Sequence, residues 1–183
     1  DDVVVGTGRT LNTDDIGLDT IGLAPGGPIE VDDSLRATGV PDGWLYAVGD
    51  ANGRNLLTHM GKYQARACGD VIVARSTGAT DDHPSMRATS DALGAPQVVF
   101  TDPQVCAVGL TESAARDQGL AIRTVEYDLG AVSGAYLEAD GYTGKAKAVI
   151  DDAADVMVGV TFVGPGVSGL LHAATIAITA RVP

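Results

Sequence analysis

The sequence predicts an α+β fold, in which an antiparallel sheet with helices on one side is preceded by a partial α/β segment. After residue 95, strand-like and helical patterns follow one another in the order ββαββ(β)α, which is typical of such a sheet. Before residue 78, an apolar run ends at Gly49-Asp50 and leads into a long helical pattern, as in α/β units. With 183 residues, 45% of them hydrophobic, the chain is long enough for one domain plus part of another.

The first residues have the pattern of a strand. Val3-Val4-Val5 is a continuous apolar run bounded by Gly6, which predicts a strand buried on both faces of a parallel sheet. Because domains seldom begin on a central strand, we expect the chain to be a fragment of a longer protein.

The segment around Gly49-Asp50 carries the most chemistry. Residues 44–48 predict a buried strand, and apolar residues at helical spacing from Leu57 predict a helix of about four to five turns that ends near Gly78. Gly49 lets another molecule approach the backbone, Asp50 offers acceptor oxygens for hydroxyl groups, and the helix start offers N–H donors and partial positive charge. A ligand with hydroxyls at one end and developing negative charge at the other would fit. For a Gly-Asp pair alone, a turn or helix-capping role is the commoner interpretation.

The rest of the chain divides into a linker and a second unit. Residues 79–95 have the composition of a linker, and His83 within it is expected to be solvated. Short strands are predicted within 97–103 and 105–109, followed by a helix over 110–119 with Thr111 as its N-cap and Gly119 as its stop. Strands are then predicted at 121–128, 144–151 and 156–163, and a helix of small residues from about Val167 to Ala180.

Composition excludes several functions. Lys and Arg number 12 against 24 Asp and Glu, so the net charge of −12 argues against nucleic acid and anionic membranes as partners. No apolar run reaches the roughly 18 residues that span a bilayer, and no signal peptide is visible, so we expect a cytoplasmic protein. Cys68 and Cys106 are predicted to be buried structural residues, and three unclustered histidines give no metal site.

Several of these motifs together resemble the pyridine nucleotide-disulfide oxidoreductases, the family of dihydrolipoamide dehydrogenase, glutathione reductase and mercuric reductase. Three segments carry the likeness: the Gly6-Thr7-Gly8-Arg9 turn, the run Ala47-Val48-Gly49-Asp50 with its following tetrad Leu56-Leu57-Thr58-His59, and the stretch VVFTDPQVCAVGLTESAARDQG at 98–119. In the family a short hairpin, here residues 29–38, precedes the Gly-Asp strand. The resemblance covers almost the whole chain.

The resemblance implies a function and a domain plan. Residues 1–14 would end the NAD-binding domain, 15–78 would be the C-terminal segment of the FAD-binding domain, 79–95 a linker, and 96–183 a C-terminally incomplete dimerisation domain. FAD would be the cofactor, with NAD(P) used by the parent enzyme. Asp50 would hold the ribityl hydroxyls, beside Gly49, and the backbone of Leu56, Leu57, Thr58 and His59 would face the flavin N1/O2 edge.

The implied activity belongs to the parent protein. A hydride would pass from nicotinamide to FAD, and a small-molecule substrate, a disulfide or a related compound, would then be reduced by a homodimer. No catalytic residue is expected here, because the chain has no close cysteine pair and ends before the family's His-Pro-Thr-x-x-Glu motif; His172 is predicted to be an interface or core residue. A stand-alone dimerisation or interaction module without chemistry is the alternative.

Overall fold

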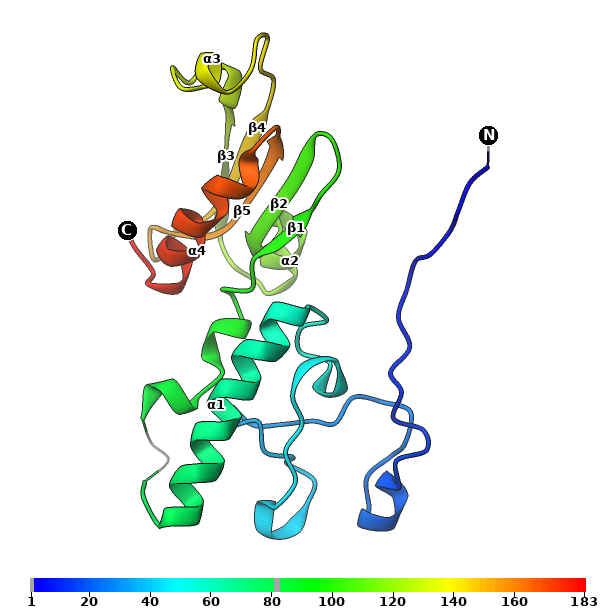
Figure 1. Ribbon diagram of the computed structural model, residues 1–183. Helices are drawn as coiled ribbons and strands as arrows, with labels where there is room; N and C mark the ends of the chain where they lie inside the picture. Colours follow the sequence, from blue (N-terminus) through cyan, green and yellow to red (C-terminus); the bar gives the residue numbers. More distant parts are fainter. Residues whose placement is uncertain (1, 81–82) are drawn as a thin grey trace. The chain divides into compact units, whose positions relative to one another are not determined.

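The chain folds into two compact units. The computed structural model describes residues 2–80 and 83–183 (Figure 1). The units are Asp1–Thr89 and Ser90–Pro183, so their boundary falls inside the segment 79–95 that has linker composition. Two residues of that segment, Asp81 and Asp82, lie outside the described part of the chain.

The first unit is built from one long helix and several single turns. The helix α1 is predicted correctly: it ends where Gly78 adopts a left-handed conformation with φ of 71°, and its Met60, Cys68 and Val71 are buried. Four 3-10 turns accompany it, and a fifth lies at the boundary between the units. These elements are η1 (Leu18–Ile21), η2 (Pro41–Gly43), η3 (Gly49–Asn52), α1 (Thr58–Thr77), η4 (Pro84–Met86) and η5 (Thr89–Asp91).

Two predicted strands of this unit are wrong. Residues 3–5 form no strand, and their valines are 88%, 92% and 79% exposed. Residues 44–48 are not a buried strand either, because Trp44 is exposed and only one isolated antiparallel bridge forms there, between Arg36 and Tyr46. A strand needs a neighbour for its backbone hydrogen bonds, and the described residues of this unit provide no parallel partner for either run.

The expected hairpin at residues 29–38 takes a reduced form. Val31 and Ala37 form an antiparallel bridge, and the Thr38 amide donates to the carbonyl of Glu30 at 3.0 Å. Leu35, at the tip, is fully buried, and its carbonyl accepts from the Ala47 amide at 3.1 Å. The hairpin is therefore tied directly to the segment that leads into Gly49.

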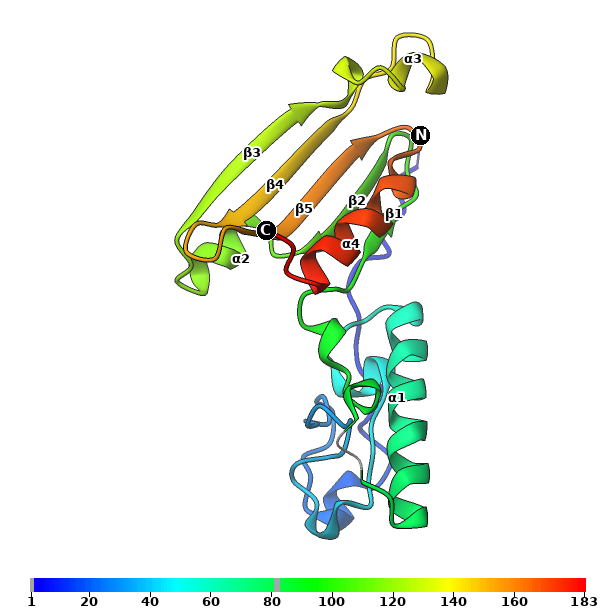
Figure 2. The ribbon, with the colours of Figure 1, turned by 90° about the vertical axis from the view of Figure 1, so that its left-hand side faces the viewer.

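The second unit is a five-stranded antiparallel sheet, as predicted. The strand order is β1-β2-β5-β4-β3, and every neighbouring pair is antiparallel. Figure 2 shows the sheet from the side on which α4 lies. The elements are β1 (Gln97–Val99), β2 (Gln104–Gly109), α2 (Glu112–Asp117), β3 (Ile122–Asp128), η6 (Leu129–Ala131), α3 (Ala135–Glu138), β4 (Lys145–Asp151), β5 (Val156–Gly164), η7 (Val167–Leu170) and α4 (Leu171–Thr179).

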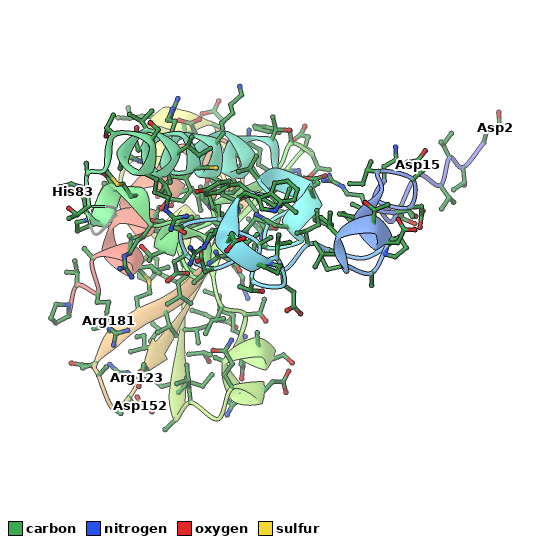
Figure 3. All side chains as sticks on the ribbon, turned by 90° about the horizontal axis from the view of Figure 1, so that it is seen from below. Asp2, Asp15, His83, Arg123, Asp152 and Arg181 are labelled. Atoms are coloured by element: carbon green, nitrogen blue, oxygen red, sulfur yellow. The ribbon has the colours of Figure 1, made fainter. Side chains whose placement is uncertain are left out.

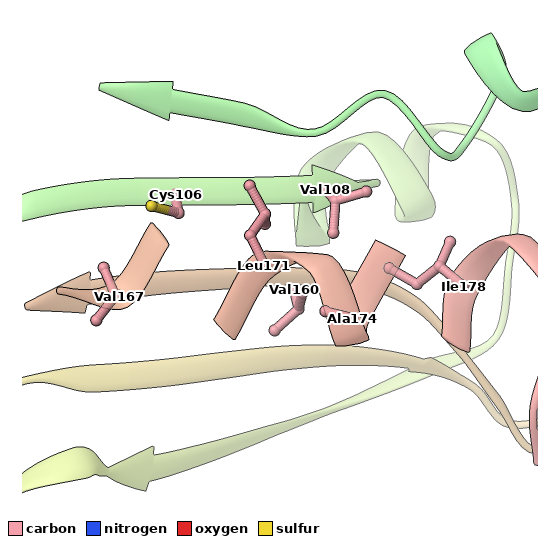
Figure 4. Close-up of a cluster of buried hydrophobic side chains, with 7 residues drawn as sticks. All are labelled: Cys106, Val108, Val160, Val167, Leu171, Ala174 and Ile178. Atoms are coloured by element: carbon pink, nitrogen blue, oxygen red, sulfur yellow. The ribbon is translucent and has the colours of Figure 1, made fainter. Parts of the chain in front are cut away.

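The helix α4 covers one face of this sheet. Its Leu171 and Ile178 pack on Cys106 and Val160 of β2 and β5 (Figure 4). Burial of Cys106 and Cys68 is confirmed, and burial raises the pKa of both thiols.

The helix α2 lies on the opposite face, so the expectation of helices on one side is not met in this detail. Its Ala115 packs on Val149, which is directly opposite Gly159 in the register and therefore shares a face with it. Gly159 adjoins Val160 along β5, and successive side chains of a strand point to opposite faces. In Figure 4, α2 accordingly lies behind the strands and α4 in front.

Ion pairs link α2 to β4, and β3 to the turn between β4 and β5. Glu112 of α2 pairs with Lys147 of β4 at 2.7 Å. Arg123 of β3 lies beside Asp152 (Figure 3), with which it pairs at 2.6 Å. It also pairs with Asp155 at 2.7 Å, and both aspartates lie in the turn between β4 and β5. Among the described residues, no helix is both long and apolar enough to cross a bilayer.

The described part of the segment 79–95 is packed rather than extended. Ala88 is fully buried in a cluster with Leu35 and Cys68, and its amide donates to the carbonyl of Asp33 at 2.8 Å. His83 is exposed, as expected, and its ring contacts the Ser85 hydroxyl at 2.8 Å. Residues 83–89 thus belong to the first unit, whereas residues 90–95 belong to the second, where Leu93 packs against the cluster that contains Cys106 and Ile178.

Candidate functional site

The Gly49-Asp50 turn presents a carboxylate at the surface. Val48 is extended, with φ of −128° and ψ of 155°, and the chain then turns sharply at Gly49, whose φ of 66° lies in the left-handed region that favours glycine. Asp50 follows in η3, and 51% of its side chain is exposed. An exposed carboxylate at a sharp turn is able to accept hydrogen bonds from a ligand's hydroxyl groups.

The start of α1 lies a few residues further along the chain. Leu57 is the N-cap, with φ of −133° and ψ of 129°, and its aliphatic side chain cannot accept a hydrogen bond from the first turn. The first helical bond of the backbone runs from the Gly61 amide to the Leu57 carbonyl at 3.0 Å. Thr58 and His59 are exposed in this first turn. A helix start without a side-chain cap attracts negative charge from outside.

Arg9 joins these two features. Its Nη1 donates to Oδ2 of Asp50 at 2.9 Å and to the carbonyl oxygen of Leu56 at 2.6 Å. Sequence reasoning singled out Arg9 only as part of a turn motif and did not predict this bridge. Since both charged side chains are about half exposed, the ion pair itself contributes at most about 1 kcal/mol. Its importance is geometric, because it holds Asp50 beside the segment that enters α1.

A buried polar network lies behind the turn. Gln64 of α1 is fully buried, and its Oε1 accepts from the Gly49 amide at 2.7 Å and from Nδ2 of Asn52 at 2.9 Å. Asn52 also donates to the Ala47 carbonyl at 3.1 Å and accepts from the Arg54 amide at 3.0 Å. Sequence reasoning missed both side chains as functional residues. A signal existed, since Gln64 is a polar residue on the apolar stripe of the predicted helix.

The structure brings the predicted site residues together around Arg9 and Gln64. Asp50 and Leu56 share the Arg9 guanidinium, and Gly49 is bonded to the helix that starts after Leu57. Within the described ranges, no group of three or more His, Cys, Asp or Glu side chains is arranged to hold a metal ion. The Asp50 carboxylate is able to accept hydrogen bonds, and the start of α1 is able to donate them.

The antiparallel sheet with its flanking helices is the fold of a disulphide oxidoreductase dimerisation domain. Residues 95–183 match the family model "Pyridine nucleotide-disulphide oxidoreductase, dimerisation domain". Residues 95–183 thus carry the dimerisation domain of the pyridine nucleotide-disulphide oxidoreductases, and the family resemblance found in the sequence is confirmed.

Curated relatives match along nearly the whole chain. The chain is 32% identical to the dihydrolipoyl dehydrogenase of Chlamydia muridarum over 182 residues, which cover 97% of this chain and 36% of that protein. Identity to the dihydrolipoyl dehydrogenase of Geobacillus stearothermophilus is also 32%, over 98% of this chain and 36% of that protein. The chain thus spans about a third of the length of these relatives.

Solved structures show the same fold. The HOCl-induced flavoprotein disulfide reductase RclA from Escherichia coli matches with a TM-score of 0.71 at 22% identity, over 97% of this chain and 38% of that protein. LpdA from Mycobacterium tuberculosis matches with a TM-score of 0.66 at 27% identity, over 93% of this chain and 35% of that protein.

Proposed function

We propose that this chain forms the flavin-holding and dimerising portion of an FAD-dependent, NAD(P)-linked oxidoreductase. The observation that carries the proposal is the placement of an exposed carboxylate, Asp50, beside an uncapped helix start, with Arg9 bonded to both. Family membership supports it, because residues 95–183 carry the dimerisation domain of pyridine nucleotide-disulphide oxidoreductases.

The residues fit FAD by their chemistry. Asp50 would accept hydrogen bonds from the ribityl hydroxyls, next to the close-approach backbone of Gly49. The backbone of residues 56–59 would face the N1/O2 edge of the flavin, where the helix start favours negative charge. That interaction is worth about 0.3–1 kcal/mol, and up to ~2 kcal/mol when partly buried. Bound FAD would supply the electron chemistry, accepting a hydride from a nicotinamide and passing two electrons to a small-molecule substrate of disulfide type.

The cysteines of this chain do not take part in that electron transfer in our proposal. Cys68 and Cys106 lie in different units, and each is buried in an apolar cluster. A thiol in such surroundings has a raised pKa and reacts slowly. The groups that reduce the substrate would therefore lie in the rest of the parent protein, and this chain alone would be inactive.

The second unit would form a homodimer through the sheet face that carries α4. This helix packs on β2 and β5, while on the same face Val125 and Tyr127 of β3 stay 50% and 56% exposed. Their register partners, Ala148 and Ala146 on β4, add further apolar surface beside them. On α4 itself, Ile176 and His172 are exposed. A second copy of the chain would bury this apolar surface.

The cofactor proposal is tested by Asp50→Ala in the full-length protein. We expect the dissociation constant for FAD to rise about tenfold or more, because a hydrogen bond to a charged group contributes roughly 1.5–3 kcal/mol. Asp70→Ala is the matched control, since it removes an exposed carboxylate from the outer surface of α1. Equal FAD content in both variants and the wild type would refute the proposal.

The dimer proposal is tested by Ile176→Glu, which places a charge on the exposed side of α4. The expected result is a shift from dimer to monomer in sedimentation velocity. Val73→Glu is the control, because Val73 is an exposed apolar residue on a helix of the other unit. A dimer that persists unchanged in Ile176→Glu would exclude this face as the interface.

A further inference from the structure

Gln64 holds the Gly49-Asp50 turn against α1. Its Oε1 accepts hydrogen bonds from the Gly49 amide, which opens the turn, and from the Asn52 side chain, which closes it. We propose that Gln64 is a positioning residue for FAD, which fixes the Asp50 carboxylate relative to the start of α1. This inference rests on the proposed function and deepens it.

The turn depends on a buried acceptor at this place. With φ at 66°, the Gly49 backbone leaves the extended conformation, and its amide donates to the side-chain oxygen of Gln64. Asn52 is buried as well, at 5% exposure. A buried donor without an acceptor is costly, so removal of Oε1 forces both donors to find new partners. The turn would therefore move whenever Gln64 loses its acceptor.

A second contact links the same two elements. A methyl group built on Gly61 of α1 would lie 3.3 Å from the Cα atom of Gly49, and one built on Gly49 would lie 3.6 Å from the Cα atom of Gly61. Helix and turn thus meet backbone against backbone, without intervening side chains. Together with Gln64, this contact makes the turn and the first two turns of α1 a single rigid block.

A rigid block suits a ligand that is held at two points. The ribityl chain would contact Asp50 while the flavin ring contacts the helix start, so both contacts form together only when their separation is fixed. Binding sites work when their groups are held within about 0.5 Å by supporting side chains. Gln64 provides that support without touching the ligand, because it is fully buried behind the turn.

The test compares Gln64→Met with Gln64→Glu in the full-length protein. Methionine keeps the length of the side chain but has no strong acceptor, whereas glutamate keeps an oxygen in the place of Oε1. We expect Gln64→Met to raise the dissociation constant for FAD at least tenfold and to change the visible circular dichroism of the FAD that stays bound. Gln64→Glu should stay within about threefold of the wild type.

A purely structural role is distinguished by Val71→Ala. Val71 is fully buried on the same helix, so its truncation destabilises α1 without touching the turn. FAD affinity should stay unchanged in Val71→Ala even where its melting temperature falls as far as that of Gln64→Met. Equal loss of affinity in the two variants would overturn the inference.

Two further variants separate the possible failures. If Gln64→Met does not fold, Asn52→Ala decides: a dissociation constant raised threefold or more supports the inference, and an unchanged one overturns it. Asp50→Ala is measured in parallel. Weak FAD binding in Asp50→Ala with normal binding in Gln64→Met would refute only the role of Gln64, whereas normal binding in Asp50→Ala would refute the proposed function itself.

Discussion

The contact between Gly49 and Gly61 decides whether an alanine at position 61 stabilises or destabilises the protein. Replacing a glycine inside a helix by alanine ordinarily stabilises it by about 0.8–1 kcal/mol. In Gly61→Ala, however, the new methyl group would lie 3.3 Å from the Cα atom of Gly49, closer than most such contacts. Gly69, on the exposed side of the same helix, has no atom within 4 Å of the same position. Gly69→Ala therefore measures only the stability gained from the higher helix propensity of alanine.

The expected result for Gly61→Ala follows from the rigidity of the turn. Gly49 cannot retreat without lengthening its 2.7 Å hydrogen bond to Gln64, so the added methyl costs about 1–3 kcal/mol, as overpacking does. We expect urea unfolding to show a gain of about 0.8–1 kcal/mol for Gly69→Ala and no gain, or a loss, for Gly61→Ala. FAD affinity should fall only in Gly61→Ala. Equal stabilisation by both substitutions would show that the Gly49 turn moves away to accommodate the added methyl group, and would refute this reasoning.

Other predictions concern protonation, thiol reactivity and close packing. Burial would raise the pKa of Asp32, but hydrogen bonds from a serine hydroxyl and two amides, with a nearby guanidinium, hold it below its usual value of 3.8. The stability that Asp32 adds over Asp32→Asn is therefore full above about pH 4 and lost as the pH falls through the lowered pKa, which acid titrations of unfolding will show. Cys68 and Cys106 should react with Ellman's reagent much more slowly in the native protein than in urea, and equally fast reaction would contradict their burial. Gly159→Ala should lower the melting temperature of the second unit strongly, since its methyl would clash with the Leu110 carbonyl oxygen; an unchanged melting curve would refute this.

Local patterns predicted the helix and the sheet because both satisfy their backbone hydrogen bonds within the chain. The helix α1 closes its bonds internally and ends at Gly78, which the sequence marks by residue type. The strands β2 to β5 pair with one another, so their apolar patterns have partners. Residues 3–5 and 44–48 have patterns of equal strength, yet a parallel strand needs neighbours that the described first unit does not supply.

The face on which α2 lies could not be predicted from the order of elements. It depends on the register between β4 and β5, which shifts between Val149 and Ile150. It also depends on Gly159, where the Leu110 backbone crosses β5 so closely that no side chain fits. Both facts concern pairs of residues that are distant in sequence. A pattern within one strand carries no information about them.

The candidate site shows the same division between local and distant information. Motifs located Asp50 and the start of α1, because each is read from a short run of residues. The separation between Asp50 and α1 is fixed by two hydrogen bonds between residues distant in sequence. Arg9 lies 41 residues before its partner Asp50, and Gln64 lies 15 residues after its partner Gly49. Such partners are recognisable in sequence only as residues out of pattern, like a glutamine on an apolar helix stripe. A polar residue buried there needs a hydrogen-bond partner. Here that partner is the amide of Gly49, which itself needs an acceptor.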